Sequence, residues 1–115
     1  MKRILVCGGR DYKDEKFIFD VLNKAYVDFK KICIIQGGAK GADSIAKKWA
    51  IEKGVPCFQC DAQWNNYGNS AGSVRNQWMI DYIDIDMVLA FPGGSGTENM
   101  YQLAKHRNIE ACKND

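Results

Sequence analysis

Short apolar runs alternate with longer stretches of helical periodicity along the whole chain. The apolar runs cover about residues 3–7, 32–36, 56–60 and 86–91, with a shorter one near 109–112. Runs of this length between glycine and polar residues are typical of strands buried on both faces of a sheet. Between them, apolar residues recur every three or four positions, which predicts helices over about 14–30, 42–53, 73–82 and 97–107.

Each predicted helix has a stripe of apolar residues that should face inward. In chain order, the inward residues we expect are Phe17, Ile18, Val21, Leu22, Ala25 and Phe29; Ala42, Ile45, Ala46, Trp49 and Ala50; Val74, Trp78 and Tyr82; and Met100, Leu103 and Ala104. The polar and aromatic stretch from Asp61 to Ala71 follows neither periodicity. We therefore expect it to form a loop.

Alternating strands and helices predict one parallel sheet with right-handed crossovers and helices on both faces. The expected fold class is therefore α/β, a Rossmann-like three-layer fold with strand order 3-2-1-4-5, in one domain over residues 1–115. The strand order reverses between the first and fourth strands. Open parallel sheets bind ligands at such a switch point, outside the carboxyl ends of the strands.

Three of the apolar runs end in glycine-rich segments that lead into predicted helices. Glycine lets the backbone approach a ligand closely, and the free N–H groups at a helix start attract anions. These segments predict a phosphate-bearing ligand that contacts Gly8, Gly9, Arg10 and Asp11; Gly37, Gly38, Ala39, Lys40, Gly41 and Asp43; and Pro92, Gly93, Gly94, Ser95, Gly96 and Thr97.

The polar residues of these segments allow more than one interpretation. Thr97 could cap its helix and donate its hydroxyl to a phosphate, or the segment could be only a tight turn. Asp43 could cap its helix, hold a ribose hydroxyl or orient the loop. Lys40 could meet a phosphate or remain solvated. Arg10 could clamp a phosphate, stack on a base, or pair with a nearby aspartate.

The stretch from Asp61 to Asn76 combines aromatic, amide and basic residues beside the expected ligand edge. Trp64 or Tyr67 could cover a nucleotide base, and the alternative is that Trp64 covers the edge of the core. Arg75 falls in the first turn of a predicted helix, where it could face an anion or remain on a solvated surface. We count Trp64, Arg75 and Asn76 among the candidate ligand-binding residues.

Composition and charge narrow the function classes. Sixteen basic and fourteen acidic residues leave a net charge of +2, which argues against a nucleic-acid partner. The apolar runs are too short to span a membrane or to form a signal peptide. The five cysteines favour a reducing, cytoplasmic setting, and the Cys57–Cys60 pair should face opposite sides of a strand.

Several kinds of site lack their signature in this sequence. No GxGxxG pattern occurs, so the standard dinucleotide fingerprint is unsupported. His106 is the only histidine and lies late in a predicted helix, which leaves no histidine triad and argues against a zinc site. We therefore expect no protein-held metal, although Mg²⁺ could enter with the phosphates of a nucleotide ligand.

Four blocks of the chain occur together in a fixed order: Val6-Cys7-Gly8-Gly9-Arg10-Asp11-Tyr12, Gly37-Gly38-Ala39-Lys40-Gly41-Ala42-Asp43, Ala71-Gly72 with Arg75-Asn76 and Met79, and Phe91 to Thr97. In these blocks the chain resembles the SLOG superfamily, which includes the Lonely Guy (LOG) phosphoribohydrolases and the DprA/Smf proteins. It is most similar to the small YspA/YpsA-related branch. The resemblance covers almost the whole chain. It implies a Rossmann-like fold that binds nucleotides or nucleotide-derived ligands, usually as a homo-oligomer, in bacteria and their phages.

The chain departs from the LOG hydrolases at one position of their motif. Those enzymes carry PGGxGTxxE, whose glutamate works with an upstream arginine to cleave an N-glycosidic bond. Arg75 matches that arginine, whereas Met100 occupies the glutamate position. Glu98 lies about 200° away around the helix. General acid–base catalysis contributes about 10²–10⁴-fold, so LOG chemistry should be largely lost unless Asp11, Asp43 or Glu98 substitutes in another geometry.

Three functions follow from these observations. The first is a module that binds a nucleotide or nucleotide-derived ligand, and that senses or sequesters a nucleotide signal, such as a host defence signal in a phage setting. The alternative is a nucleotide-processing hydrolase with Arg75, Asp43 or Glu98 as candidate catalytic residues. A second alternative is DNA binding of the DprA type. We also expect a homodimer or higher homo-oligomer, with an interface formed by Trp78, Met79, Ile83, Met100 and Tyr101.

Overall fold

Five parallel strands form one sheet in the order β3-β2-β1-β4-β5, which confirms the α/β class and the predicted strand order. The computed structural model describes residues 1–115, except for the side chain of Asn69. The strands are β1 (Lys2–Cys7), β2 (Ile32–Gln36), β3 (Cys57–Gln59), β4 (Met87–Ala90) and β5 (Glu110–Lys113).

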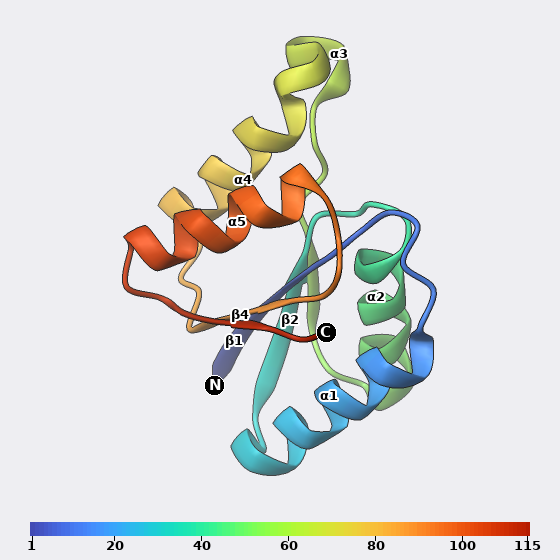
Figure 1. Ribbon diagram of the computed structural model, residues 1–115. Coiled ribbons are helices and arrows are strands. Elements are labelled where there is room, and N and C mark those ends of the chain that lie inside the picture. The colour runs from blue at the N-terminus through green and yellow to red at the C-terminus, as the bar shows by residue number, and fades with distance from the viewer.

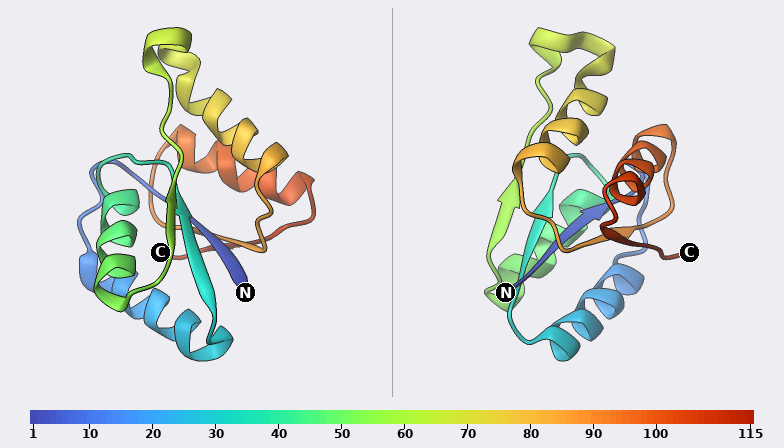
Figure 2. Two further views of the ribbon diagram at one scale, coloured as in Figure 1. Left: turned by 180° about the vertical axis from the view of Figure 1, so that it is seen from behind. Right: turned by 90° about the vertical axis from the view of Figure 1, so that its left-hand side faces the viewer.

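Helices cover both faces of the sheet (Figure 1). They are α1 (Glu15–Phe29), α2 (Ala42–Lys53), α3 (Trp64–Tyr67), α4 (Ala71–Tyr82) and α5 (Ser95–His106), with a 3₁₀ turn at Gly68–Ser70 between α3 and α4. Helices α1 and α2 pack on one face, and α4 and α5 pack on the other (Figures 1 and 2). No helix among the described residues has the length and apolar character needed to cross a membrane.

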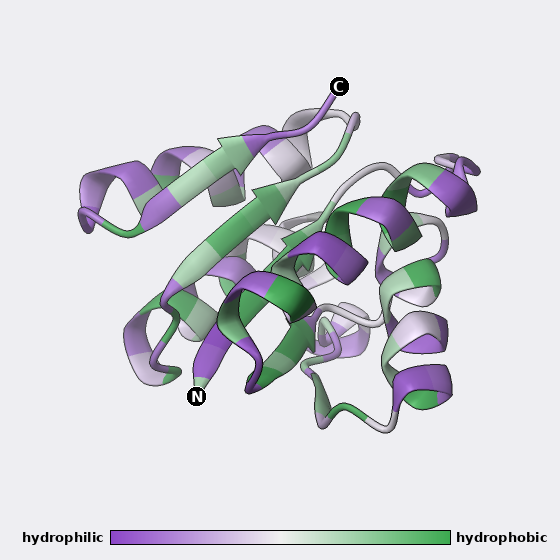
Figure 3. Ribbon diagram, turned by 90° about the horizontal axis from the view of Figure 1, so that it is seen from below, coloured by the Kyte–Doolittle hydropathy of each residue, from purple (hydrophilic) through white to green (hydrophobic). Residues whose placement is uncertain are grey.

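Side chains alternate between two hydrophobic clusters along the central strands. In β1, Ile4 and Val6 join the cluster beneath α1 and α2, whereas Leu5 joins the cluster beneath α4 and α5. Successive side chains of a strand point to opposite faces, so a strand covered on both faces must be apolar at every position. Figure 3 shows the resulting contrast between the strands, which are mainly hydrophobic, and the helices, which carry both hydrophobic and hydrophilic residues.

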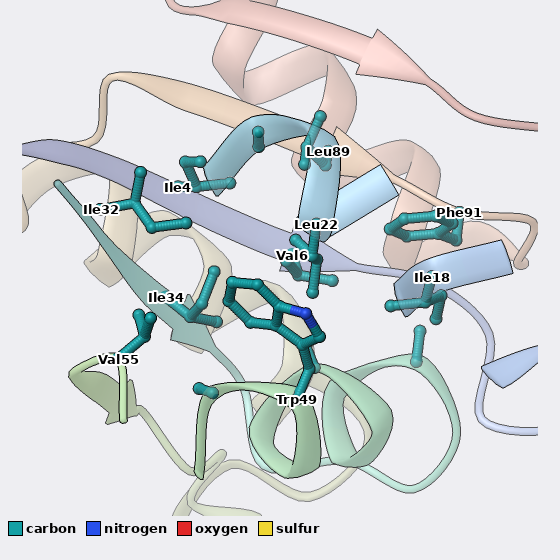
Figure 4. Close-up of a cluster of buried hydrophobic side chains, with 14 of the residues drawn as sticks. Ile4, Val6, Ile18, Leu22, Ile32, Ile34, Trp49, Val55, Leu89 and Phe91 are labelled. Atoms are coloured by element: carbon teal, nitrogen blue, oxygen red, sulfur yellow. The ribbon is translucent and has the colours of Figure 1, made fainter. Parts of the chain in front are cut away.

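Trp49 of α2 lies at the centre of the first cluster, where its ring points toward the sheet among Val6, Leu22 and Ile34 (Figure 4). It is fully buried, and its indole Nε1 donates a hydrogen bond of 2.8 Å to Oδ1 of Asn23. A buried indole needs such a partner because an unpaired buried N–H is unfavourable. The inward stripes predicted for the first two helices agree with this packing, except that Phe29 is exposed.

The segment expected to be a loop from Asp61 to Ala71 is largely helical. It contains α3 and the 3₁₀ turn, and α4 begins at Ala71, two residues before the predicted start. The inward face predicted for this helix was also wrong. Val74, Trp78 and Tyr82 are exposed, whereas Met79 and Ile80 are buried against the second cluster. Helix α4 has apolar residues on both faces, so its periodicity does not decide which face packs on the sheet.

This register also corrects the predicted oligomer surface. Met79 and Met100 are both about 1% exposed and belong to the core beneath α4 and α5. They are therefore not part of a surface that another copy of the chain can contact. Helix α5 begins at Ser95 after an N-cap at Gly94, so Thr97 lies inside the first turn. Thr97 therefore does not have the capping role considered for it from the sequence.

Candidate functional site

A cavity of about 370 Å³ lies at the carboxyl edge of the sheet, next to the switch point between β1 and β4. Its walls come from all three glycine-rich segments together with α3 and the start of α4. The lining residues are Cys7, Gly8, Gly9, Arg10, Ala39, Asp43, Trp64, Gly72, Ser73, Arg75, Asn76, Gly94, Ser95, Gly96 and Thr97. Most of them are among the residues that the sequence singled out.

The glycine-rich segments pack directly against one another at the edge of the cavity. The Gly9 amide donates to the Pro92 carbonyl at 2.8 Å, and the Gly9 carbonyl accepts from the Ala42 amide at 3.2 Å. A Cβ on Gly8 would lie 2.6 Å from Cβ of Ala42, and one on Gly93 would lie 2.6 Å from the Gly9 nitrogen. These separations are too short for non-bonded atoms. Gly8 and Gly93 are therefore required for close packing of the loops.

Gly94 and Gly96 differ from the glycines that pack between loops. A Cβ at either position would meet no atom within 4 Å, and both residues line the cavity. No side chain caps α5, and the first hydrogen bond that closes its N-terminus runs from the Glu98 amide to the Gly94 carbonyl at 3.1 Å. The amides of Ser95, Gly96 and Thr97 precede that bond, so they have no acceptor within the helix.

The side chain of Asp43 forms hydrogen bonds within its own glycine-rich segment. Oδ2 of Asp43 accepts hydrogen bonds of 3.2 Å from both the Gly37 and the Ala39 amides. Asp43 is 6% exposed, and this burial raises the pKa of its carboxyl above the ordinary value, against the lowering effect of these amides and of Arg75. Of the three roles left open for Asp43, the structure shows the one that orients the loop. The Gly37 and Ala39 amides are therefore already hydrogen-bonded to Asp43 and do not supply donors for a phosphate.

Arg75 and Asn76 connect the second glycine-rich segment to the third. Nη1 of Arg75 donates to the Gly37 carbonyl at 2.7 Å, and its Nε donates to Oδ1 of Asn76 at 3.0 Å. Nδ2 of Asn76, which is 5% exposed, then donates to the Gly96 carbonyl at 3.2 Å. Nη2 of Arg75 makes no hydrogen bond to a described residue. Since no buried polar side-chain atom of the described residues lacks a partner, Nη2 is not fully buried.

Arg10 and Trp64 meet over the same cavity from segments far apart in the sequence. Cζ of Arg10 lies 5.1 Å from the centre of the Trp64 ring, a cation–π contact. Of the alternatives for Arg10, pairing with a nearby aspartate is not seen among the ion pairs of the described chain. Trp64 remains 48% exposed, so this contact leaves much of the indole surface uncovered.

Some candidate residues do not line this cavity. Those outside it are Asp11, Gly37, Gly38, Lys40, Gly41, Pro92 and Gly93. Asp11 and Lys40 have exposed side chains, whereas Gly37 is buried against the guanidinium of Arg75. Gly37 and Gly38 instead line an adjoining cavity of about 260 Å³, to which Arg10, Trp64 and Arg75 also contribute.

Of the carboxylates proposed as catalytic candidates, only Asp43 lines the cavity. Glu98 lies outside the cavity and accepts hydrogen bonds from Lys113 at 3.0 Å and Gln102 at 2.9 Å. These partners lower the pKa of its carboxyl. Met100, at the position of the LOG glutamate, is buried in the core. Asp43 is the one carboxylate among the described residues that line the cavity beside Arg75.

Sequence reasoning missed several residues of the site. Gln36 at the end of β2 is 1% exposed, and its Oε1 accepts from the Gly38 amide at 2.5 Å while its Nε2 donates to Gln59 at 3.0 Å. A polar residue that ends an apolar run was the available signal. Cys7, Gly72 and Ser73 also line the cavity. No local pattern distinguished Cys7 or Ser73 from ordinary strand and helix residues.

The cysteines are all free. Burial raises the pKa of Cys7 to about 12, so its thiol is protonated at neutral pH. Cys57 packs with the cluster beneath α1 and α2, whereas Cys60 packs with the cluster beneath α4 and α5, which confirms that the pair faces opposite sides. No group of three or more histidine, cysteine or acidic side chains that could hold a metal ion is found among the described residues.

Comparison with known proteins identifies relatives of this chain and of its fold. The chain is 32% identical to the Gene 61 protein of Mycobacterium phage D29, over 95% of this chain and 93% of that protein. Its fold matches the crystal structure of MurG from Acinetobacter baumannii with a TM-score of 0.59 at 13% identity. This match covers 98% of this chain but only 34% of MurG, and at that identity it shows the fold alone.

The family comparison agrees with the resemblance drawn from the four sequence blocks. Residues 2–67 match the family model described as the YspA, cpYpsA-related SLOG family, which spans β1 through α3 and includes two of the three glycine-rich segments. The match covers more than half of the chain, and the phage relative extends the similarity over nearly all of it. The protein belongs to the YspA, cpYpsA-related SLOG family.

Proposed function

We propose that this protein binds a nucleotide or nucleotide-derived ligand in the cavity at the carboxyl edge of its sheet. The observation that carries the proposal is the composition of that cavity, which is lined both by the uncapped N-terminus of α5 and by Arg10 and Arg75. Family membership and the Rossmann-like fold are compatible with this ligand class. A phosphate would be bound by the amides of Ser95, Gly96 and Thr97.

The charges around the cavity favour an anion. Arg10 and Arg75 bring two positive charges to its lining, against the single negative charge of Asp43. The carboxylate of Asp43 is turned toward the Gly37 and Ala39 amides, so it is partly neutralised by the loop that it orients. Charge-assisted hydrogen bonds to phosphate are about twice as strong as neutral ones, and the guanidinium of Arg75 is held by the Gly37 carbonyl.

The aromatic side chain at the cavity completes the proposed site. The uncovered surface of Trp64 would stack on the base, with Arg10 beside it. Such stacking contributes about 1–3 kcal/mol per base. We infer that binding, rather than turnover, is the function, because Met100 replaces the motif glutamate and Glu98 is turned toward Lys113. The protein would then sense or sequester a nucleotide signal, with any Mg²⁺ entering through the phosphates.

A titration with matched variants tests this proposal. AMP, ADP and inorganic phosphate are titrated into the protein by calorimetry, with Mg²⁺ and then with EDTA. Arg10→Ala and Lys40→Ala each remove one exposed positive charge from a glycine-rich segment, but only Arg10 lines the cavity. We expect Arg10→Ala to weaken AMP binding at least tenfold and Lys40→Ala to change it less than twofold. Equal effects would indicate a general attraction for anions and would refute the site.

Native mass spectrometry of the purified protein supplies an independent test. A nucleotide that co-purifies and is returned unchanged after incubation with fresh protein would support a binding function and would identify the ligand. Conversion of that nucleotide to base and ribose phosphate would contradict the inference that the protein binds without turnover.

One observation favours hydrolysis as a second candidate function. Asp43 lines the cavity beside Arg75, and burial raises the pKa of its carboxyl, a change that a general acid requires. In this reaction the N-glycosidic bond would break as Asp43 protonates the leaving base, and water would add its hydroxyl to the anomeric carbon and return a proton to Asp43. Arg75 would stabilise negative charge on the sugar phosphate. Asp43→Asn keeps a carbonyl oxygen to accept from the Gly37 and Ala39 amides. Product formation by this variant at the wild-type rate would exclude Asp43 as the acid.

A further inference from the structure

A second cavity, of about 360 Å³, adjoins the proposed nucleotide site and is lined mainly by aromatic and apolar side chains. We propose that it is a subsite for a second planar ring of the same ligand, which makes that ligand a phosphate-linked molecule with a heterocycle at each end. This inference rests on the proposed nucleotide-binding function. The cavity is lined by Cys60, Asp61, Gln63, Tyr67, Ala71, Val74, Arg75 and Trp78.

Arg75 connects the two cavities. Arg75 lines both of these cavities. It also lines the smaller cavity of about 260 Å³, to which Trp64 and Asp61 contribute as well. Trp64 contributes to the first and the smaller cavity, and Asp61 to the second and the smaller one. The surface is therefore continuous from the α5 N-terminus, past Arg75, to the outward face of α4. A phosphate linkage bound at Arg75 would adjoin one cavity lined by Trp64 and another lined by Tyr67 and Trp78.

The walls of the second cavity are suited to a ring. Trp78 and Tyr67 are 49% and 48% exposed, which matches the 48% of Trp64 in the first cavity. Trp78 also packs on Tyr82, with ring centres 5.5 Å apart and planes inclined by 40°. That contact restricts the Trp78 ring before any ligand arrives, so less side-chain freedom is lost on binding.

Polar groups in the second cavity indicate how a ring would be recognised. Oδ1 of Asp61 accepts from Nε2 of Gln59 at 2.8 Å, whereas Oδ2 has no partner among the described residues. A carboxylate oxygen accepts hydrogen bonds only, so it selects rings with an N–H donor, such as an exocyclic amine or a ring carboxamide. Oε1 of Gln63 already accepts a hydrogen bond from Nδ2 of Asn66 at 2.9 Å, so this acceptor is engaged.

The test compares ligands with one and two rings. AMP, GMP, diadenosine diphosphate and diguanosine diphosphate are titrated into the wild type, Trp78→Ala and Phe58→Ala. Phe58 is the control, because it is an exposed aromatic residue that lines none of the three cavities and does not pack on Trp78. We expect one two-ring probe to bind the wild type at least tenfold more tightly than its mononucleotide. Trp78→Ala should abolish that difference while leaving mononucleotide affinity within twofold.

The alternative outcomes separate the two proposals. If no probe binds, the proposed function fails and the subsite fails with it. If mononucleotides bind but the two-ring probes bind no better, or if Trp78→Ala does not reduce their advantage, the subsite is overturned while the nucleotide site stands. Light scattering is run on the same samples. A dimer that Trp78→Ala dissociates, without any preference for two-ring probes, would show that this surface contacts a second copy of the chain and would also overturn the subsite.

Discussion

Gly93 and Gly96 lie in one glycine-rich segment, but the structure gives them different roles, and alanine substitution should separate these roles. A Cβ on Gly96 would meet no atom within 4 Å and would stand beside the cavity at the start of α5. A Cβ on Gly93 would overlap the Thr97 hydroxyl and lie 2.6 Å from the Gly9 nitrogen. One substitution should therefore affect ligand binding and the other should affect folding.

The expected magnitudes follow from these surroundings. Replacing glycine by alanine where the backbone is compatible stabilises a protein by about 0.4–1 kcal/mol, because the unfolded chain loses freedom. For Gly96→Ala this corresponds to a rise in Tm of about 2–4 °C for a domain of this size. Overpacking typically costs about 1–3 kcal/mol, so Gly93→Ala should lower Tm by several degrees. It would also separate the two loops that the Gly9–Pro92 hydrogen bond holds together.

Differential scanning calorimetry measures the stability of each variant, and AMP titration measures its affinity. We expect Gly96→Ala to gain stability and yet to bind AMP at least tenfold more weakly, because the added methyl group blocks the approach of phosphate to the α5 amides. A stable Gly96→Ala protein with affinity within twofold of the wild type would refute phosphate binding at this loop. An unchanged Tm for Gly93→Ala would refute the packing role of Gly93.

Two further predictions follow from titratable groups at the cavity. Burial raises the pKa of the Asp43 carboxyl above its ordinary value of 3.8. The folded protein therefore binds the carboxyl proton more tightly than the unfolded chain does. As a result, the contribution of Asp43 to the free energy of unfolding falls as the pH rises from about 4 through the raised pKa. In urea titrations, Asp43→Asn should therefore gain stability over the wild type as the pH is raised from about 4 to 7, and a difference that does not change with pH would contradict the assigned burial. The pKa of Cys7 is raised to about 12 from 9.0, so its thiolate fraction at pH 8 should be about a thousandfold lower than that of a cysteine with the ordinary pKa. Iodoacetamide should therefore leave Cys7 unmodified in the native protein but alkylate it in urea. Peptide mass mapping reads out this comparison, and labelling of Cys7 in the native protein would contradict the raised pKa of its thiol.

The local pattern of the chain was sufficient to predict the five strands and the four long helices in their order, although it missed α3 and the 3₁₀ turn that follows it. Residues 4–6 of β1 and 32–35 of β2 are buried on both faces of the sheet, so burial favours apolar side chains at successive positions, and this pattern is visible without any structure. Helices α1 and α2 each pack through one clear stripe, which their periodicity shows. The strand order followed from general rules on crossovers, and the glycine-rich segments marked the edge where the cavity lies.

The face of α4 could not be predicted from its sequence. Trp78 and Tyr82 point outward although they are large and apolar, and Met79 and Ile80 are buried instead. Both faces of this helix carry apolar residues. The choice between them depends on the shape of the space above the sheet, to which α5 and the second hydrophobic cluster contribute.

The roles of individual site residues depended on contacts between distant segments. The sequence by itself identified Asp43, Arg75 and the glycines as candidates, because these residue types suit anion binding. Only the tertiary structure showed that Asp43 closes its own loop, that Arg75 holds Gly37, and that Gly96 is left open. Residue type determines which bonds a side chain is able to make, whereas the partner it actually has depends on which distant atoms the fold brings within hydrogen-bonding reach.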